Sequence, residues 1–75
     1  MDEQTLEQLL VELIAAQQQV LLKIGCRLVP HLTSDDVLQP NDFPELEFNP
    51  HFRYEEGILA GLLSAQAAVR SKKFS

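Results

Sequence analysis

The sequence predicts an all-α protein, an antiparallel two-helix hairpin whose helices are joined by a long proline-rich strap. Three observations lead to this prediction. All four prolines fall between residues 30 and 50, so two arms lack the residue that breaks helix interiors. Apolar residues recur in both arms at steps of three and four, the period of a helix with one buried face. Glycine occupies only 3 of 75 positions, few for a β fold rich in tight turns.

The first helix is expected over residues about 4–28. Thr5 and Gln8 have the spacing of a capping box at its start, and Asp2 offers an earlier start. Pro30 pushes the residue before it out of the helical region and ends the helix. The residues expected to pack against another helix share one face, and they include Leu6, Leu10, Leu13, Ile14 and Leu21.

The second helix is expected over residues about 50–71. Asn49 is a good cap, and Pro50 suits the first helical position. Small residues recur along this arm at steps of four, three and four, namely Gly57, Gly61, Ser64 and Ala68. Because glycine costs a helix about 1 kcal/mol, this strip predicts a close contact with the first helix or with a second copy of the chain. A groove for a peptide or small ligand is the alternative.

The strap, residues 30–49, is longer than the two to eight residues that usually join helices. Its Thr33 and Asp36 have capping-box spacing, which predicts a one-turn helix near 34–38. The segments around Phe43 and Phe48 have the composition of turns. We expect an ordered strap that lies on the helices. The alternative is an acidic and apolar segment that docks into another protein.

Composition and charge narrow the function. The net charge is −5, and the strap alone carries −5 because the two arms cancel. Such a chain repels phosphate backbones, so no nucleic acid is expected as a partner. No apolar run approaches the roughly 20 residues of a membrane span, and no leader peptide is evident, so no membrane partner is expected. The single cysteine, Cys26, favours a reducing compartment, and we expect a cytoplasmic protein.

The first helix is apolar on more than one seam, because Leu9 and Ala16 flank the main stripe and Leu22 lies off it. A fully buried Leu is worth roughly 1.5–3 kcal/mol, so leaving these residues wet is costly. One partner helix and a strap cannot cover them all. The sequence therefore predicts a homodimer that forms a four-helix bundle, with a hetero-complex or a strap-covered monomer as alternatives.

Few residues of the sequence suggest catalysis or metal binding. No catalytic constellation or phosphate loop is present, so we expect no enzyme and no cofactor. His51 and Glu55 have a spacing that metals use, although a local contact explains it as well. Cys26 is interpreted as a small buried filler. The candidates for binding a partner lie in the strap and the start of the second helix, namely Phe43, Phe48, Phe52, Arg53, Tyr54 and Glu55.

These observations suggest a single domain, residues 1–75, with residues 1–3 and 72–75 frayed. The leading hypothesis is a small protein–protein interaction module, such as an adaptor, small chaperone or assembly factor, that acts as a homodimer. A second hypothesis makes the chain an accessory subunit that folds fully only with a larger partner. A third is a ligand- or metal-binding helical bundle that uses His51, Glu55 and Glu56.

Overall fold

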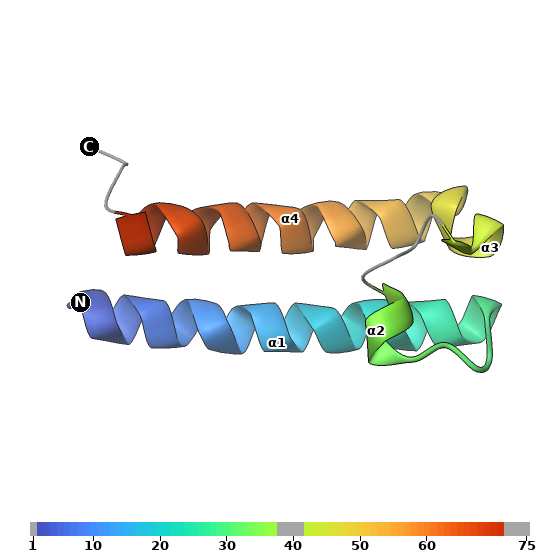
Figure 1. The fold of residues 1–75 in the computed structure, drawn as a ribbon, viewed down its shortest axis with the longest axis horizontal. Coiled ribbons are helices and arrows are strands. Elements are labelled where there is room, and N and C mark those ends of the chain that lie inside the picture. Colours follow the sequence, from blue (N-terminus) through green and yellow to red (C-terminus); the bar gives the residue numbers. More distant parts are fainter. Residues whose placement is uncertain (1, 38–41, 72–75) are drawn as a thin grey trace.

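The computed structural model describes residues 2–37 and 42–71, and helices are the regular elements of these two ranges. The all-α prediction is confirmed, since these residues contain no strand. The helices are α1 (Glu3–Leu28), α2 (Ser34–Val37), α3 (Pro44–Glu47) and α4 (Pro50–Ser71) (Figure 1).

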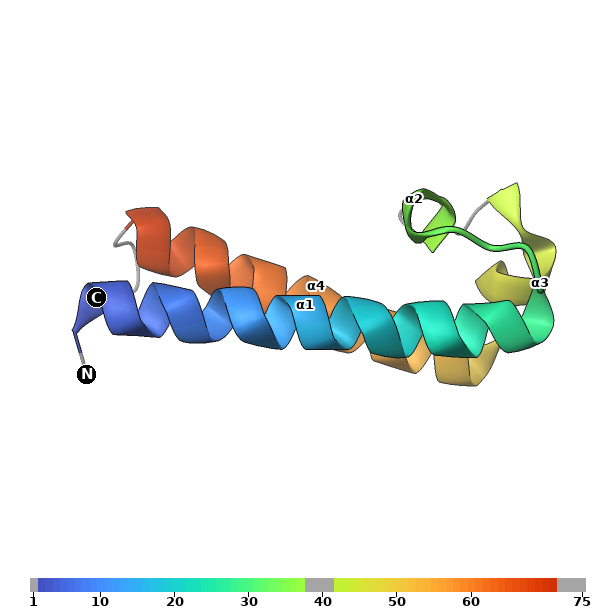
Figure 2. The ribbon, with the colours of Figure 1, turned by 90° about the horizontal axis from the view of Figure 1, so that it is seen from below.

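The two long helices, α1 and α4, lie side by side and run in opposite directions (Figure 1). The start of α1 and the end of α4 meet at one end of the pair, which we call the terminal end. The short helices lie at the other end, which we call the strap end, and α2 rests on one side of α1 (Figure 2). The molecule is therefore an elongated body with extents of 40 × 19 × 18 Å.

Asp2 starts α1. Its Oδ1 accepts a hydrogen bond from the Thr5 amide at 2.7 Å, and this bond holds the pKa of the Asp2 carboxyl below its ordinary value. Asp2 therefore caps α1 and Glu3 is its first residue, and the fraying of residues 1–3 and 72–75 stays a prediction, since residues 1 and 72–75 lie outside the described residues. At the other end Val29 is extended, as expected before Pro30.

The strap contains two short helices. In α2 the reciprocal capping box forms as the sequence predicts, because the Thr33 amide donates to Asp36 at 3.1 Å and the Asp36 amide donates to Thr33 at 3.3 Å. The expected last residue of this turn, Leu38, lies outside the described residues. The helix α3 is not predicted, since a turn is expected there. Pro44 occupies its first turn, and Phe43 before it is extended.

The buried core lies toward the strap end and is made by all the helices. Its largest fully buried side chains are Phe52, Leu21 and Leu46. The strap supplies much of it, since Leu32, Val37 and Leu46 are all buried. Gly25 is needed here, because a Cβ at this position would collide with Leu32 and lie 3.7 Å from both Leu46 and Phe52. The missing side chain lets the strap close over the end of α1.

Candidate functional site

The side of the α1–α4 pair that faces away from α2 is apolar and uncovered. The helix α2 lies over one side of the pair, because its Val37 lines a groove together with Leu21 of α1 and Leu63 of α4. Each residue turns a helix by about 100°, which places two rows of side chains on the opposite side. We call these rows together the open face. On α1 the row is Leu6, Leu9, Leu13, Ala16 and Val20, and on α4 it is Tyr54, Ile58, Gly61, Ala65 and Ala68.

Large apolar side chains on the open face are half exposed. Leu9 is 40% and Leu13 is 43% exposed, and Ile58 is 38% exposed. Single exposed leucines are ordinary on protein surfaces, but these lie in contiguous rows, and such patches mark interaction sites. The rows contain no charged residue between Leu6 and Val20 or between Tyr54 and Ala68, and Lys23 and Arg27 follow the α1 row toward the strap end. The open face is therefore the strongest candidate for a binding surface in the described part of the chain.

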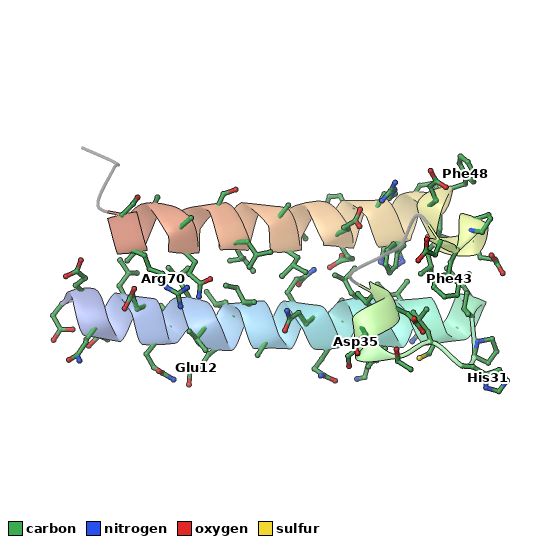
Figure 3. All side chains as sticks on the ribbon, viewed as in Figure 1. Glu12, His31, Asp35, Phe43, Phe48 and Arg70 are labelled. Atoms are coloured by element: carbon green, nitrogen blue, oxygen red, sulfur yellow. The ribbon has the colours of Figure 1, made fainter. Side chains whose placement is uncertain are left out.

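The contacts between α1 and α4 show approximately which residues of the two rows lie at the same height. The Gln17 side chain donates to the Glu55 carbonyl at 2.8 Å, and Arg70 pairs with Glu7 at 3.5 Å. Figure 3 shows Arg70 reaching from α4 to α1. Midway between these two contacts, the residues of the α1 row lie at about the heights of those of the α4 row, namely Leu6 near Ala68, Leu9 near Ala65, Leu13 near Gly61, Ala16 near Ile58 and Val20 near Tyr54.

The strip of small residues on α4 makes no close contact with α1. A Cβ at Gly57 or Gly61 would find no atom within 4 Å, and Ser64 is exposed. The prediction that this strip packs tightly on the first helix is wrong, because α4 turns Phe52 and Leu59 toward α1 and the strip lies to the side. Contact of this strip with a second copy of the chain stays a prediction.

The other predicted packing residues divide between two surfaces. Leu10, Ile14 and Leu21 are buried beneath α4, as expected for one seam of α1. Leu6 is half-buried and Leu13 is exposed, because both lie on the neighbouring seam. Sequence periodicity detects that α1 has a broad apolar surface but does not show which seam α4 covers.

The aromatic candidates also divide. Phe52 is fully buried and cannot contact a partner in this fold, so its interpretation as a partner-binding residue is wrong. Phe43 is half-buried and packs against the core. Phe48 and Tyr54 are exposed by 77% and 68%, and Phe48 points outward at the strap end (Figure 3). Two of the four aromatic candidates therefore remain accessible.

The charged candidates at the start of α4 have structural contacts. Arg53 donates to the Glu47 carbonyl at 3.0 Å and pairs with Glu56 at 2.6 Å, which ties α3 to α4. Glu55 accepts a hydrogen bond from Gln17 at 2.9 Å and lies 3.9 Å from His51. Within residues 2–37 and 42–71 no three metal-ligating side chains gather.

Small-molecule binding finds little support in the groove between α1, α2 and α4. Its volume is about 160 Å³, smaller than the roughly 300–1,000 Å³ of typical ligand pockets. The thiol of Cys26 lies half-buried and donates to the Leu32 carbonyl at 3.5 Å. This contact fits a packed side chain rather than a reactive one.

By length and composition alone, α1 resembles a helix that could cross a membrane. A core helix of a soluble protein and a signal sequence have the same character. A lone spanning helix is apolar all round, whereas α1 carries a polar side, on which Gln8, Glu12 and Gln19 lie. Figure 3 shows Glu12 pointing away from α4. This pattern is typical of an amphipathic helix that packs one side against other elements.

Comparison with known proteins adds no further constraint, since the chain matches no protein-family model, no curated protein and no solved structure.

Proposed function

We propose that this protein is a small protein–protein interaction module that acts as a homodimer, in which two helical hairpins pair through their open faces into a four-helix bundle. The observation that carries the proposal is the open face itself, an uncharged surface on which Leu9, Leu13 and Ile58 are half exposed. Covering apolar surface contributes roughly 25 cal/mol per Å², which makes a partner for this face favourable.

The size of the face supports pairing. A body with extents of 40 × 19 × 18 Å presents a long side of roughly 700 Å², close to the about 800 Å² that each partner buries in a standard interface, and the α1 row of the open face extends over about 21 Å of that side at about 1.5 Å per residue. A 75-residue chain also has a thin core, and such chains commonly gain stability by assembling. The net charge of −5 argues against nucleic acid as the partner.

An adaptor, small chaperone or assembly factor needs a second surface for its client, and Phe48 at the strap end is the accessible aromatic side chain suited to that role. Because Phe48 lies at the tip and not in either row of the open face, pairing would leave it available. The accessory-subunit hypothesis uses the same open face but fills it with helices of a larger protein. Among the described residues no three metal-ligating side chains gather and the groove beside α2 is small, so the open face supports the homodimer better than a ligand- or metal-binding bundle.

A matched pair of substitutions tests the homodimer. Leu13 on the open face and Val11 on the other side of α1 are equally exposed, at 43% and 42%. In a lone chain, Leu13→Gln and Val11→Gln should therefore have similarly small effects. In a homodimer paired through the open face, only Leu13→Gln places a polar amide in the interface, twice per dimer. We expect sedimentation equilibrium to show its dimer weakened at least tenfold, or about 1.4 kcal/mol, with Val11→Gln unchanged.

Two results would contradict the proposal. A wild-type chain that stays monomeric at tens of micromolar has no homodimer to weaken, and equal weakening by the two variants would move the interface away from the open face. Partition of the wild-type monomer into vesicles of neutral phospholipid would instead assign the open face to a lipid surface.

A further inference from the structure

The two rows of the open face are complementary in size at four of the five heights, the exception being Val20 beside Tyr54. Where α1 carries a leucine, the neighbouring residue of α4 is alanine or glycine, as for Leu9 beside Ala65 and Leu13 beside Gly61. Farther toward the strap end the sizes reverse, and the small Ala16 stands beside Ile58. A surface of this kind has a ridge along one helix and a hollow along the other. It is matched by a partner that presents a hollow to the ridge and a ridge to the hollow.

We infer that the partner is a second copy related by a two-fold axis parallel to the helices, so that α1 of each copy packs on α4 of the other at the same height. This inference rests on the proposed homodimer and deepens it. Rotation about that axis turns the face over and exchanges the rows without shifting them along the helices. Leu13 then lies on Gly61 of the second copy, and Leu9 lies on Ala65 of that copy.

The other two-fold arrangement is disfavoured by packing. An axis across the helices would stack α1 on α1 and α4 on α4. If this axis crossed at the height of Leu13 and Gly61, Leu13 would face Leu13 of the second copy, and Gly61 would face Gly61 of that copy. Overfilled and underfilled regions both destabilise an interface, whereas alternating large and small residues across facing positions allows close packing.

The inferred arrangement also gives the small residues of α4 a purpose. Gly57 and Gly61 touch nothing in the single chain, yet glycine in the middle of a helix is unfavourable. Gly61 lies in the α4 row, and Gly57 and Ser64 border that row on its outer side. An incoming α1 helix with leucine side chains can approach such a surface closely, and this close packing offsets the free-energy cost of glycine in the helix.

Charge is compatible with this arrangement. The α2 helices of the two copies would lie at the same end of the bundle, each with Asp35 and Asp36. Each α2 is on the side of its copy that faces away from the other, as the position of α2 in Figure 2 makes clear. Two helix layers separate them, a distance well beyond the Debye length of about 8 Å at physiological ionic strength. In each copy Lys23 and Arg27 continue the α1 row at that end.

Disulfide formation between two differently tagged chains tests the arrangement. Each chain carries Cys26→Ala, so that the introduced cysteine is its single thiol. One population carries Leu13→Cys and the other Gly61→Cys, and they are mixed, allowed to exchange and oxidised. We expect the mixed disulfide to exceed the Leu13→Cys homodisulfide at least fivefold. The control populations carry Val11→Cys and Leu63→Cys, which lie on the opposite side of the pair and are equally exposed, at 42% and 44%; they should not cross-link.

The outcomes separate the two proposals. If the cysteine variants sediment as dimers but Leu9→Cys, Leu13→Cys or Ala16→Cys forms mainly homodisulfides, the axis runs across the helices and the inferred arrangement is overturned while the homodimer stands. If Val11→Cys links to Leu63→Cys instead, the open face is not the interface. If wild-type chains sediment as monomers, the homodimer itself fails.

Discussion

Replacing Phe52 with alanine is expected to abolish cooperative folding. Phe52 is fully buried at the first turn of α4 and packs in the core with Leu21 and Leu46. Truncating a buried phenylalanine costs roughly 3–5 kcal/mol, because transfer free energy is lost and a cavity remains. Domains of this size rarely have more than about 3–5 kcal/mol in total. Far-UV circular dichroism should therefore show a broad, non-cooperative loss of helix on heating.

The matched control for this substitution is Phe48→Ala. Phe48 is 77% exposed, so its truncation should change the free energy of unfolding by no more than about 0.5 kcal/mol. A Phe52→Ala variant that melts cooperatively within a few degrees of the wild type would show that the strap end is not packed as described. Equal effects of the two substitutions would exclude the assignment of Phe52 to the core and Phe48 to the surface.

The second large effect is expected from Leu46→Ala in the strap. Leu46 is fully buried, although it belongs to a connection of a kind that usually lies on the surface. Its truncation should cost roughly 2–5 kcal/mol and lower the melting temperature by about 10 °C or more. The expectation follows from the position of α3, which places this side chain near Gly25 and Phe52.

This substitution also decides between the two interpretations of the strap. If the strap were a free docking segment for another protein, Leu46→Ala would leave thermal stability unchanged and weaken only binding. Leu63→Ala is the matched control, since Leu63 is 44% exposed and the same atoms are removed. We expect its cost to be less than half that of Leu46→Ala. Equal shifts in melting temperature would contradict the burial of the strap.

Local signals in the sequence predict the elements well. Proline position and cap chemistry act within a few residues, so Asn49 predicts the start of α4, where its side chain accepts a hydrogen bond from the Phe52 amide at 2.8 Å. The capping box of Thr33 and Asp36 forms for the same reason. The missed helix α3 had a signal, since Pro44 is followed by Glu45, but aromatic and proline residues in that segment are equally typical of turns.

The arrangement of the elements is harder to predict because it depends on contacts between residues far apart in the chain. Periodicity places Leu10 and Leu13 on one broad apolar surface, but only the direction of α4 decides that the first is buried and the second exposed. The same holds for Phe52, whose composition suits a partner surface as well as a core. Gly25 differs from Gly57 and Gly61 because Leu32 and Leu46 of the strap and Phe52 of α4 close over it.

The uneven distribution of the core along the long axis has a consequence for local opening. The interconnected buried cluster runs from the strap helices to Ile14 and Leu59, and among the described residues only Leu10 and Val69 are buried beyond it toward the terminal end. Amide hydrogens in the first turns of α1 and the last turns of α4 should therefore exchange with solvent through fraying, while those around Leu21 exchange through global unfolding. Because the leucines of the α1 row lie mostly in that fraying half, pairing of two chains should slow exchange there most.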